Sequence, residues 1–391
     1  MIAAPVPLRP ARHRHFGMDW LRIGAFALLI VYHVGMVFVP WNFHVKSLHV
    51  EDWATLPMLA TNAWRLTLLF VVSGYASRAL LARSSVARFF GNRCYRLLVP
   101  LAFGIVVIVP PQPWVELVTK HGYTADYWTF WTRDYFRFGT LGGLALPSWN
   151  HLWFVVYLWV YTVALTIGVA VVRGPWLQRA FDRVFGGVLV LVLPAAWLVF
   201  VHGWWFRMVG ESQALFGDWV AHVTYFPAFL FGFGLARSEP AMAAIARWWK
   251  VAAVVAVLGY GVVIGVELYW PADSGPPRWA YAPYGVAHAL EQWGAIVALI
   301  GIAEIYWNRD HRLRPMLTEA VFPFYIVHQT IIVLAMYALL GAGLPGWAEF
   351  ALILATTVIG CVLFYRIGRR IPLGRPLIGL RRHLRRSPTI L

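Results

Sequence analysis

Long apolar stretches alternate with short polar segments along almost the whole chain. Each stretch holds about 20 residues, the length at which an α-helix crosses a hydrocarbon core of roughly 30 Å. Because lipid offers the backbone no hydrogen-bond partners, stretches of this kind are helical. The run 187–200 is continuously apolar and lacks the two-residue alternation of a β-barrel strand. The predicted spans are 19–39, 61–82, 94–110, 148–172, 186–202, 219–236, 249–270, 284–307, 318–341 and 346–366. The pattern therefore predicts an all-α integral membrane protein with about ten transmembrane helices.

The basic residues outside these spans alternate from one connection to the next. The formal net charge of +16 comes mostly from the termini and from every second connection. The remaining connections hold only Lys46, Lys120, Arg133, Arg137, Arg207 and Arg278. Cytoplasmic loops carry such an excess of Lys and Arg, so both termini are predicted to be cytoplasmic. The charge is then a signal of topology and of attraction to anionic lipid, and nucleic-acid binding is not expected.

Three parts follow from this topology, all in a multi-pass protein of the cell (inner) membrane. They are a cytoplasmic segment 1–18, a polytopic membrane domain 19–366 and a basic cytoplasmic tail 367–391. The two cysteines, Cys94 and Cys361, fall near inner ends of spans, where thiols stay reduced. Neither has neighbours suited to bind a metal, so no disulfide framework and no metal site are predicted.

The longest outer connection, 111–147, opens with closely spaced prolines that are expected to end the third helix. It is rich in Trp, Tyr and Phe. This composition fits a platform on which sugar rings stack, and it fits an interfacial aromatic belt, which is the favoured interpretation.

Ionisable side chains within spans are costly in lipid and indicate functional sites. In the first span, Arg22 and His33 are eleven residues apart. That spacing is close to three helical turns, so both lie on one helix face about 16 Å apart along the axis. A cation at the inner mouth and a base deep on the same face suit a substrate with an anionic head and a distant reactive group. Acyl-coenzyme A has this shape. Taken alone, Arg22 could snorkel to lipid phosphates and His33 could be a satisfied core histidine.

Further polar candidates lie at or inside other spans. Arg93 and Arg96 share a face at the inner end of the third span, where their guanidinium groups could bind phosphates or only anchor the helix. Glu291 has nearly the same predicted depth as His33 and could support it, or could pair with Arg65. Candidates for substrate binding are His151, Trp153, His328 and Ser73, although Ser73 with Gly74 also permits close helix approach.

Several short motifs resemble segments of the type-3 acyltransferase family of membrane proteins, in the same order along the chain. The Arg22-x10-His33 pair resembles the first-helix motif of that family, and Arg93-x-x-Arg96 resembles its second. The other similar segments are 70–75 (FVVSGY), 151–154 (HLWF) and 325–328 (YIVH). Segments 19–22 (DWLR) and 40–46 (PWNFHVK) look most like the branch containing glucan succinyltransferases.

The resemblance implies transfer of an acyl group, acetyl or succinyl, from cytoplasmic acyl-CoA to a hydroxyl of an extracytoplasmic or lipid-linked carbohydrate. Arg22, Arg93 and Arg96 would then hold the nucleotide phosphates, and His33, supported by Glu291, would act as general base. The alternative from another class is a secondary transporter or a lipid or glycan flippase, which also combines many helices with buried charge.

Overall fold

The structure is a computed structural model that describes residues 15–172, 174–205, 211–270 and 275–381. Most of these residues are helical, and strands occur only in a short hairpin in which Gly139 pairs with Leu146. The principal helices are α1 (Phe16–Gly35), α2 (Thr55–Leu81), α3 (Val86–Phe103), α4 (Pro111–Lys120), α6 (Trp153–Val171), α7 (Trp176–Phe185), α8 (Leu189–Phe200), α9 (Trp219–Leu235), α10 (Glu239–Tyr269), α11 (Tyr281–Tyr306), α12 (Arg314–Leu339) and α13 (Gly346–Arg370). The short elements are η1 (Asp52–Ala54), η2 (Gly104–Ile108), α5 (Tyr127–Thr129), η3 (Phe130–Asp134), β1 (Gly139–Leu141), β2 (Leu144–Leu146), η4 (Asn150–Leu152), η5 (Val201–Trp205), η6 (Arg278–Ala280) and α14 (Gly374–Leu377).

The all-α membrane fold expected from the sequence is confirmed. In the described part of the chain, eight helical segments are long and apolar enough to cross a membrane. A ninth span results if α7 and the helix after it, which are bent by 93°, are counted as one. The remaining predicted span corresponds to α9, whose 17 residues make it a short apolar helix. Helix α13 ends at Arg370 rather than at position 366, so the predicted tail begins as helix.

Glycine allows two helices to meet backbone to backbone at the centre of the bundle. A Cβ atom on Gly74 of α2 would come within 1.9 Å of the carbonyl oxygen of Phe229 in α9. A Cβ on Gly232 of α9 would come equally close, at 1.9 Å, to the carbonyl oxygen of Val71. Only glycine fits at these positions, which confirms that the Ser73–Gly74 pair permits close helix approach.

The third span is longer than the sequence indicated. Helix α3 continues through the π-helical turn η2 into α4, and the segment Val86–Lys120 is apolar enough to be one candidate span. Pro111 occupies the first turn of α4, where its missing N–H leaves no hydrogen bond unmade. The prediction that these prolines end the helix at an outer loop was therefore wrong, and α4 brings polar side chains toward the bundle.

The aromatic segment that follows α4 forms a small core of its own. Phe130 and Tyr135 are fully buried against Leu117 and Leu146, whereas Trp128 and Phe138 are largely exposed. Because Phe130 and Tyr135 are buried, only the exposed aromatic residues of this segment can belong to an interfacial belt or a sugar-stacking platform.

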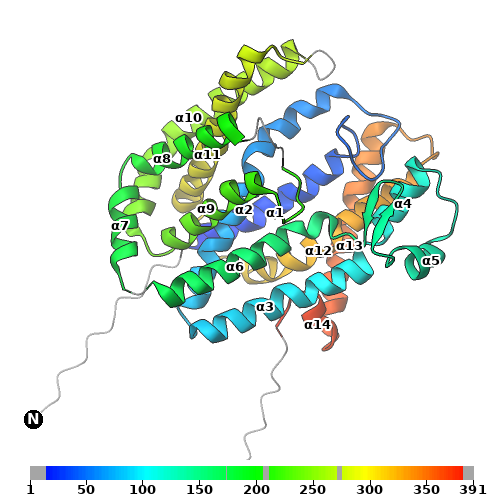
Figure 1. The fold of residues 1–391 in the computed structure, drawn as a ribbon, viewed down its shortest axis with the longest axis horizontal. Coiled ribbons are helices and arrows are strands. Elements are labelled where there is room, and N and C mark those ends of the chain that lie inside the picture. The colour runs from blue at the N-terminus through cyan, green and yellow to red at the C-terminus, as the bar shows by residue number, and fades with distance from the viewer. Residues whose placement is uncertain (1–14, 173, 206–210, 271–274, 382–391) are drawn as a thin grey trace, which may run out of the picture.

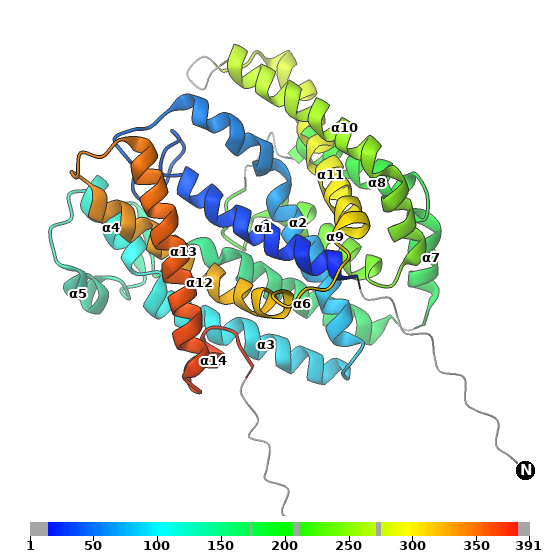
Figure 2. The ribbon, with the colours of Figure 1, turned by 180° about the vertical axis from the view of Figure 1, so that it is seen from behind.

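Helix α1 runs through the middle of the bundle, between groups of helices on either side (Figure 1). Helices α8, α10 and α11 lie on one side, and α13, α4 and α5 lie on the other, as the view from behind also shows (Figure 2). Within the described residues, α1 contacts α2, α11, α12 and α13. Residues 1–14 and 382–391 lie outside the description, and so do most of the predicted N-terminal segment and the end of the predicted tail.

Candidate active site

Two histidines from opposite parts of the chain meet beside α1. Nδ1 of His33, in the last turn of α1, lies 3.0 Å from Nε2 of His328 in the middle of α12. Their ring centroids are 5.0 Å apart. His328 is fully buried, whereas His33 keeps part of its surface open. The structure thus joins one predicted catalytic residue to one predicted substrate-binding residue.

The hydrogen bonds of the pair determine which ring nitrogens carry protons. Nδ1 of His328 lies 2.8 Å from the carbonyl oxygen of Tyr325, which can only accept, so this nitrogen carries the proton. With both rings neutral, Nε2 of His328 is an acceptor, and Nδ1 of His33 donates to it. Nε2 of His33 then keeps its lone pair, and no described residue donates a hydrogen bond to it. That nitrogen is available as a general base.

His151 completes a cluster of three imidazoles around α12. Its ring lies 5.3 Å from that of His328, nearly perpendicular to it. Nε2 of His151 donates to the carbonyl oxygen of Ile326 at 2.9 Å, and the hydroxyl of Tyr325 donates to the backbone carbonyl of His151. Successive carbonyls of α12 therefore fix both His328 and His151.

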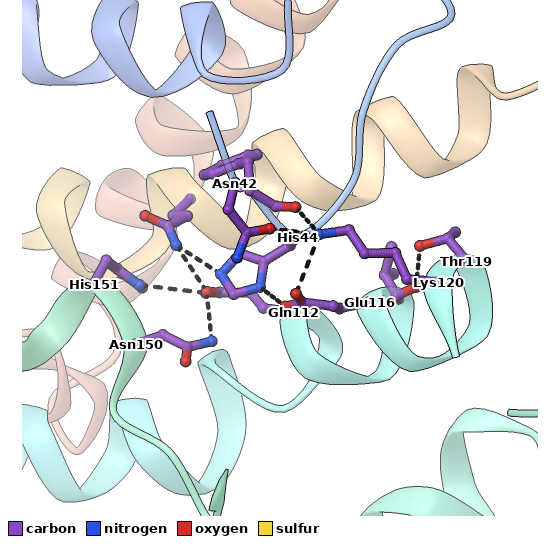
Figure 3. Close-up of polar contacts among 11 residues, drawn as sticks. Asn42, His44, Gln112, Glu116, Thr119, Lys120, Asn150 and His151 are labelled. Carbon is purple, nitrogen blue, oxygen red and sulfur yellow. Dashed lines mark hydrogen bonds and ion pairs between the residues drawn. The ribbon is translucent and has the colours of Figure 1, made fainter. Parts of the chain in front are cut away.

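A buried glutamine ties His151 to neighbouring elements (Figure 3). Gln112 of α4 donates to Nδ1 of His151 at 3.3 Å and to the hydroxyl of Thr330 at 2.7 Å. Its side-chain oxygen accepts from Asn150 and Gln329, each at 3.1 Å. All four hydrogen-bonding positions of this amide are used, so the network defines the position of His151.

The same network continues to a carboxylate–imidazole pair that the sequence did not predict. Gln329 donates to Nε2 of His44 at 3.1 Å, and Nδ1 of His44 donates to Glu116 at 2.6 Å. Glu116 also accepts from Lys120, at 3.2 Å. Figure 3 shows these side chains in a row leading from His151 along α4. His44 belongs to segment 40–46, and Glu116 lies where an outer loop was expected, so their meeting depends on the continuation of the third span through α4.

Three arginines gather at the end of the bundle where α1 begins. Arg22 of α1 donates to the carbonyl oxygen of Thr318 at 2.8 Å, Arg93 donates to Ser77 at 3.3 Å, and Arg96 donates to the carbonyl oxygen of Gly379 at 3.3 Å. Arg22 is close enough to both of the others to interact electrostatically with them. Among the residues described, no carboxylate forms an ion pair with any of the three.

The arginine group has unused hydrogen-bonding capacity. Nε of Arg22 and Nε of Arg93 are buried and have no partner in the described part of the chain. Like charges that converge with no described carboxylate in direct ion-pair contact, and with buried donors left over, form a site suited to an anion of high charge. The sequence prediction that Arg22, Arg93 and Arg96 belong to one group is therefore matched by their arrangement.

Glu291 does not support His33 as predicted. Both of its carboxylate oxygens are buried without a hydrogen-bond partner in the described structure, and the imidazole partner of His33 is His328. The backbone and Cβ of Glu291 face Gly259 of α10. Helices α1 and α11 do meet, where Gly17 touches Ala303, but they diverge from there (Figure 2). Pairing of Glu291 with Arg65, the alternative, is also not observed.

The contacts that Trp153 and Ser73 make within the described residues do not involve the histidine cluster. Trp153 is buried in α6 and packs on Phe70, Phe154, Tyr157 and Tyr225. Ser73 lies next to the α2–α9 contact, and its carbonyl oxygen accepts from the hydroxyl of Ser77. Their predicted roles in substrate binding remain predictions.

Comparison with known proteins identifies the family to which the chain belongs. Residues 15–366 match the type-3 family described as an acyltransferase domain. The chain is also 27% identical over 179 residues to proteins named glucans biosynthesis protein C from Salmonella heidelberg, Salmonella agona and Salmonella schwarzengrund. That alignment covers 46% of this chain and 42% of each relative, so the chain spans less than half the length of these relatives. No solved structure matches the chain significantly.

Proposed function

The chain belongs to the type-3 family of membrane acyltransferases, and on that premise we propose that it moves an acetyl or succinyl group from acyl-CoA to a hydroxyl of a glycan. The acceptor is an extracytoplasmic or lipid-linked carbohydrate, and the protein resides in the cell (inner) membrane. The observation that carries the proposal is that α1 bears one member of each cluster, His33 of the His33–His328 pair and Arg22 of the arginine group. The names of the Salmonella relatives support a glucan as acceptor.

The arginine group suits the nucleotide end of the donor. Coenzyme A carries several phosphate charges, and guanidinium groups bind phosphate through paired N–H donors. Arg22, Arg93 and Arg96 supply three cations, and the buried Nε atoms of Arg22 and Arg93 supply donors without partners. These residues fit the phosphates of acyl-CoA without displacement of a competing carboxylate.

The histidine pair suits the acyl end. Arg22 and His33 are separated by about 16 Å along α1, a distance comparable to an extended pantetheine arm. A donor whose phosphates lie at Arg22 therefore carries its thioester to the level of His33. There Nε2 of His33 removes the proton from the acceptor hydroxyl, while His328 holds the ring through its Nδ1–H and stabilises the imidazolium that forms. The direct route needs no covalent acyl-enzyme.

The predicted orientation of the protein in the membrane agrees with these roles of the two ends of the site. The positive-inside pattern predicts that the arginine group lies on the cytoplasmic side, with the acyl-CoA donor, and that the His44–Glu116 end of the network lies on the opposite side, with the proposed glycan. Transfer then occurs within the membrane, between substrates that enter from opposite faces.

The test is acyl transfer by the purified protein in lipid vesicles. Radiolabelled acetyl-CoA or succinyl-CoA is supplied on the side of the arginine group and a glucan oligosaccharide on the other, and ester-linked label on the glucan is measured. We expect label with wild type and none with His33→Ala at matched protein amount. Label movement without ester formation would instead indicate the transporter alternative, and full activity of a well-folded His33→Ala protein would remove the catalytic assignment.

A further inference from the structure

A fourth arginine is buried near the histidine pair and forms no ion pair with any described residue. Arg65, in the outer half of α2, is only 3% exposed. Its Nε and Nη1 atoms are buried and have no hydrogen-bond partner in the described structure. No carboxylate of the described residues lies within ion-pair distance of it. A buried, unpaired guanidinium is costly in a membrane interior and indicates a function.

Arg65 is held against the residue next to His33. Its guanidinium carbon lies 3.4 Å from the ring centroid of Tyr32, and the rings of Tyr32 and His33 are 6.0 Å apart. The guanidinium is thus one aromatic ring away from the imidazole, and the two interact electrostatically. The hydroxyl of Tyr32 donates to the side-chain oxygen of Asn62 at 3.0 Å, which helps to hold the ring under the guanidinium.

The stacking contact does not account for the whole guanidinium. A cation–π contact uses the face of the group, whereas its N–H donors lie in the plane and point past the ring. Nε–H and the Nη1–H bonds lie on different edges of that plane, so each edge keeps a donor for an acceptor outside the described residues. A rigid, buried cation with unpartnered donors near a general base is suited to stabilise an oxyanion.

We propose that Arg65 stabilises the oxyanion that forms on the thioester carbonyl during acyl transfer. This inference rests on the proposed function. As Nε2 of His33 takes the hydroxyl proton, the acceptor oxygen bonds to the carbonyl carbon, and the carbonyl π-electron pair moves onto its oxygen beside Arg65. When the intermediate collapses, that pair re-forms the C=O bond, the C–S bond breaks, its electrons go to sulfur, and the proton on His33 passes to the thiolate. The products are an ester and coenzyme A, and the balance requires no further reactant.

The experiment compares chemistry with donor binding in variants of Arg65. For Arg65→Ala we expect the single-turnover rate at saturating acyl-CoA to fall by about 100- to 1,000-fold, the usual loss on removing one oxyanion donor. The dissociation constant of acyl-CoA should change little, because the phosphates lie at the other end of α1. Millimolar methylguanidinium should restore part of the rate to Arg65→Ala, and equal methylammonium should not. Arg65→Lys keeps the charge without the planar guanidinium and should recover only part of the rate.

The controls separate this inference from the proposed function. Thr61→Val, on the same helix, removes a hydroxyl that donates to the carbonyl of Met58 within α2, and it should transfer at close to the wild-type rate. Arg65→Ala or Arg65→Gln with wild-type single-turnover rates would overturn the role of Arg65 and leave the acyltransferase proposal intact. Equal losses of donor affinity and rate, or failure of every Arg65 variant to fold in detergent, would make Arg65 a structural residue. Absence of transfer by wild type with either donor would overturn the proposed function itself.

Discussion

Nε2 of His328 lies 3.0 Å from Nδ1 of His33, although the two residues are 295 positions apart in the chain. The contact joins the end of α1 to the middle of α12 and uses Nδ1 of His33, which leaves Nε2 for the chemistry proposed above. Because the carbonyl of Tyr325 orients His328, the backbone of α12 ultimately determines which nitrogen of His33 is basic.

This arrangement predicts that His328 acts through His33. Replacement by leucine removes the acceptor for the Nδ1–H of His33, so the ring can turn or change tautomer. We expect kcat to fall by about 10²- to 10⁴-fold, the range over which general bases contribute, with acyl-CoA affinity nearly unchanged. The measurement is a steady-state assay of glucan acylation with an independent binding titration.

A second variant tests whether His328 orients the ring of His33 or only fills buried space. His328→Gln retains a side-chain oxygen that can accept from His33, and it should keep more activity than His328→Leu at equal thermal stability. Equal activity of the two variants, or loss of folding in both, would contradict the assignment of His328 as a positioning residue.

Substitutions in the arginine group should weaken the binding of acyl-CoA and leave the rate of the chemical step nearly unchanged. Each charge-assisted hydrogen bond that is lost costs about 1.5–3 kcal/mol, or roughly a 10- to 100-fold loss of affinity. Arg93→Ala and Arg96→Ala should therefore weaken acyl-CoA binding, as measured by calorimetry in detergent. Arg88→Ala is the control, because Arg88 lies on the same helix but is exposed to solvent. If Arg88→Ala weakens binding as much, the arginines of α3 only anchor the helix.

The sequence predicted those parts of the site that lie on one helix or are defined by composition. The apolar runs gave the spans, and the 100° rotation per residue put Arg22 and His33 on one face of α1. The resemblance of Arg93-x-x-Arg96 to a family motif, and not charge alone, suggested that these arginines accompany Arg22, and the structure brings all three together.

Contacts between helices were beyond the sequence, because depth in the membrane says nothing about which way a side chain points around its helix. Glu291 has the predicted depth of His33 but faces Gly259 on α10. His44 and Glu116 were missed for a related reason, since Pro111 and Pro113 indicated a loop where α4 continues the helix. The tolerance of proline in the first turn of a helix was the signal that could have revealed α4.

The start of α1 gives a prediction about stability and pH. The hydrogen bond from His15 to Glu304, at 2.9 Å, raises the pKa of His15 above its usual value of 6.5. A raised folded-state pKa contributes stability that is complete below the unfolded pKa and is lost as pH rises through the folded pKa. Thermal stability should therefore decline as pH increases above about 6.5, by at most about 1 kcal/mol from this pair. His15→Gln should flatten this part of the profile, and an unaltered profile would show that the pair contributes nothing measurable.

The membrane orientation can be checked by labelling. In a background with Cys94→Ser and Cys361→Ser, single cysteines at the exposed positions Thr140 and Arg278 should react with an impermeant thiol reagent in intact cells. Cysteines at Arg179 and Arg312, which are also exposed in the structure, should react only after the membrane is opened. The reverse pattern would place the arginine group outside and would contradict a cytoplasmic donor.

The network from Lys120 to His151 predicts a coupled loss of stability and turnover. Glu116→Gln leaves an oxygen for His44 or for Lys120 but presents an N–H₂ group to the other, so one charge-assisted hydrogen bond is lost at about 1.5–3 kcal/mol. Thermal stability should fall. Because Gln329 and Gln112 connect His44 to His151, kcat should fall as well, with acyl-CoA affinity unchanged. Thr119→Val is the control, since the Thr119 hydroxyl donates within α4, to the carbonyl of Val115. A Glu116→Gln protein that loses stability but keeps wild-type kcat per folded molecule would confine the network to a structural role.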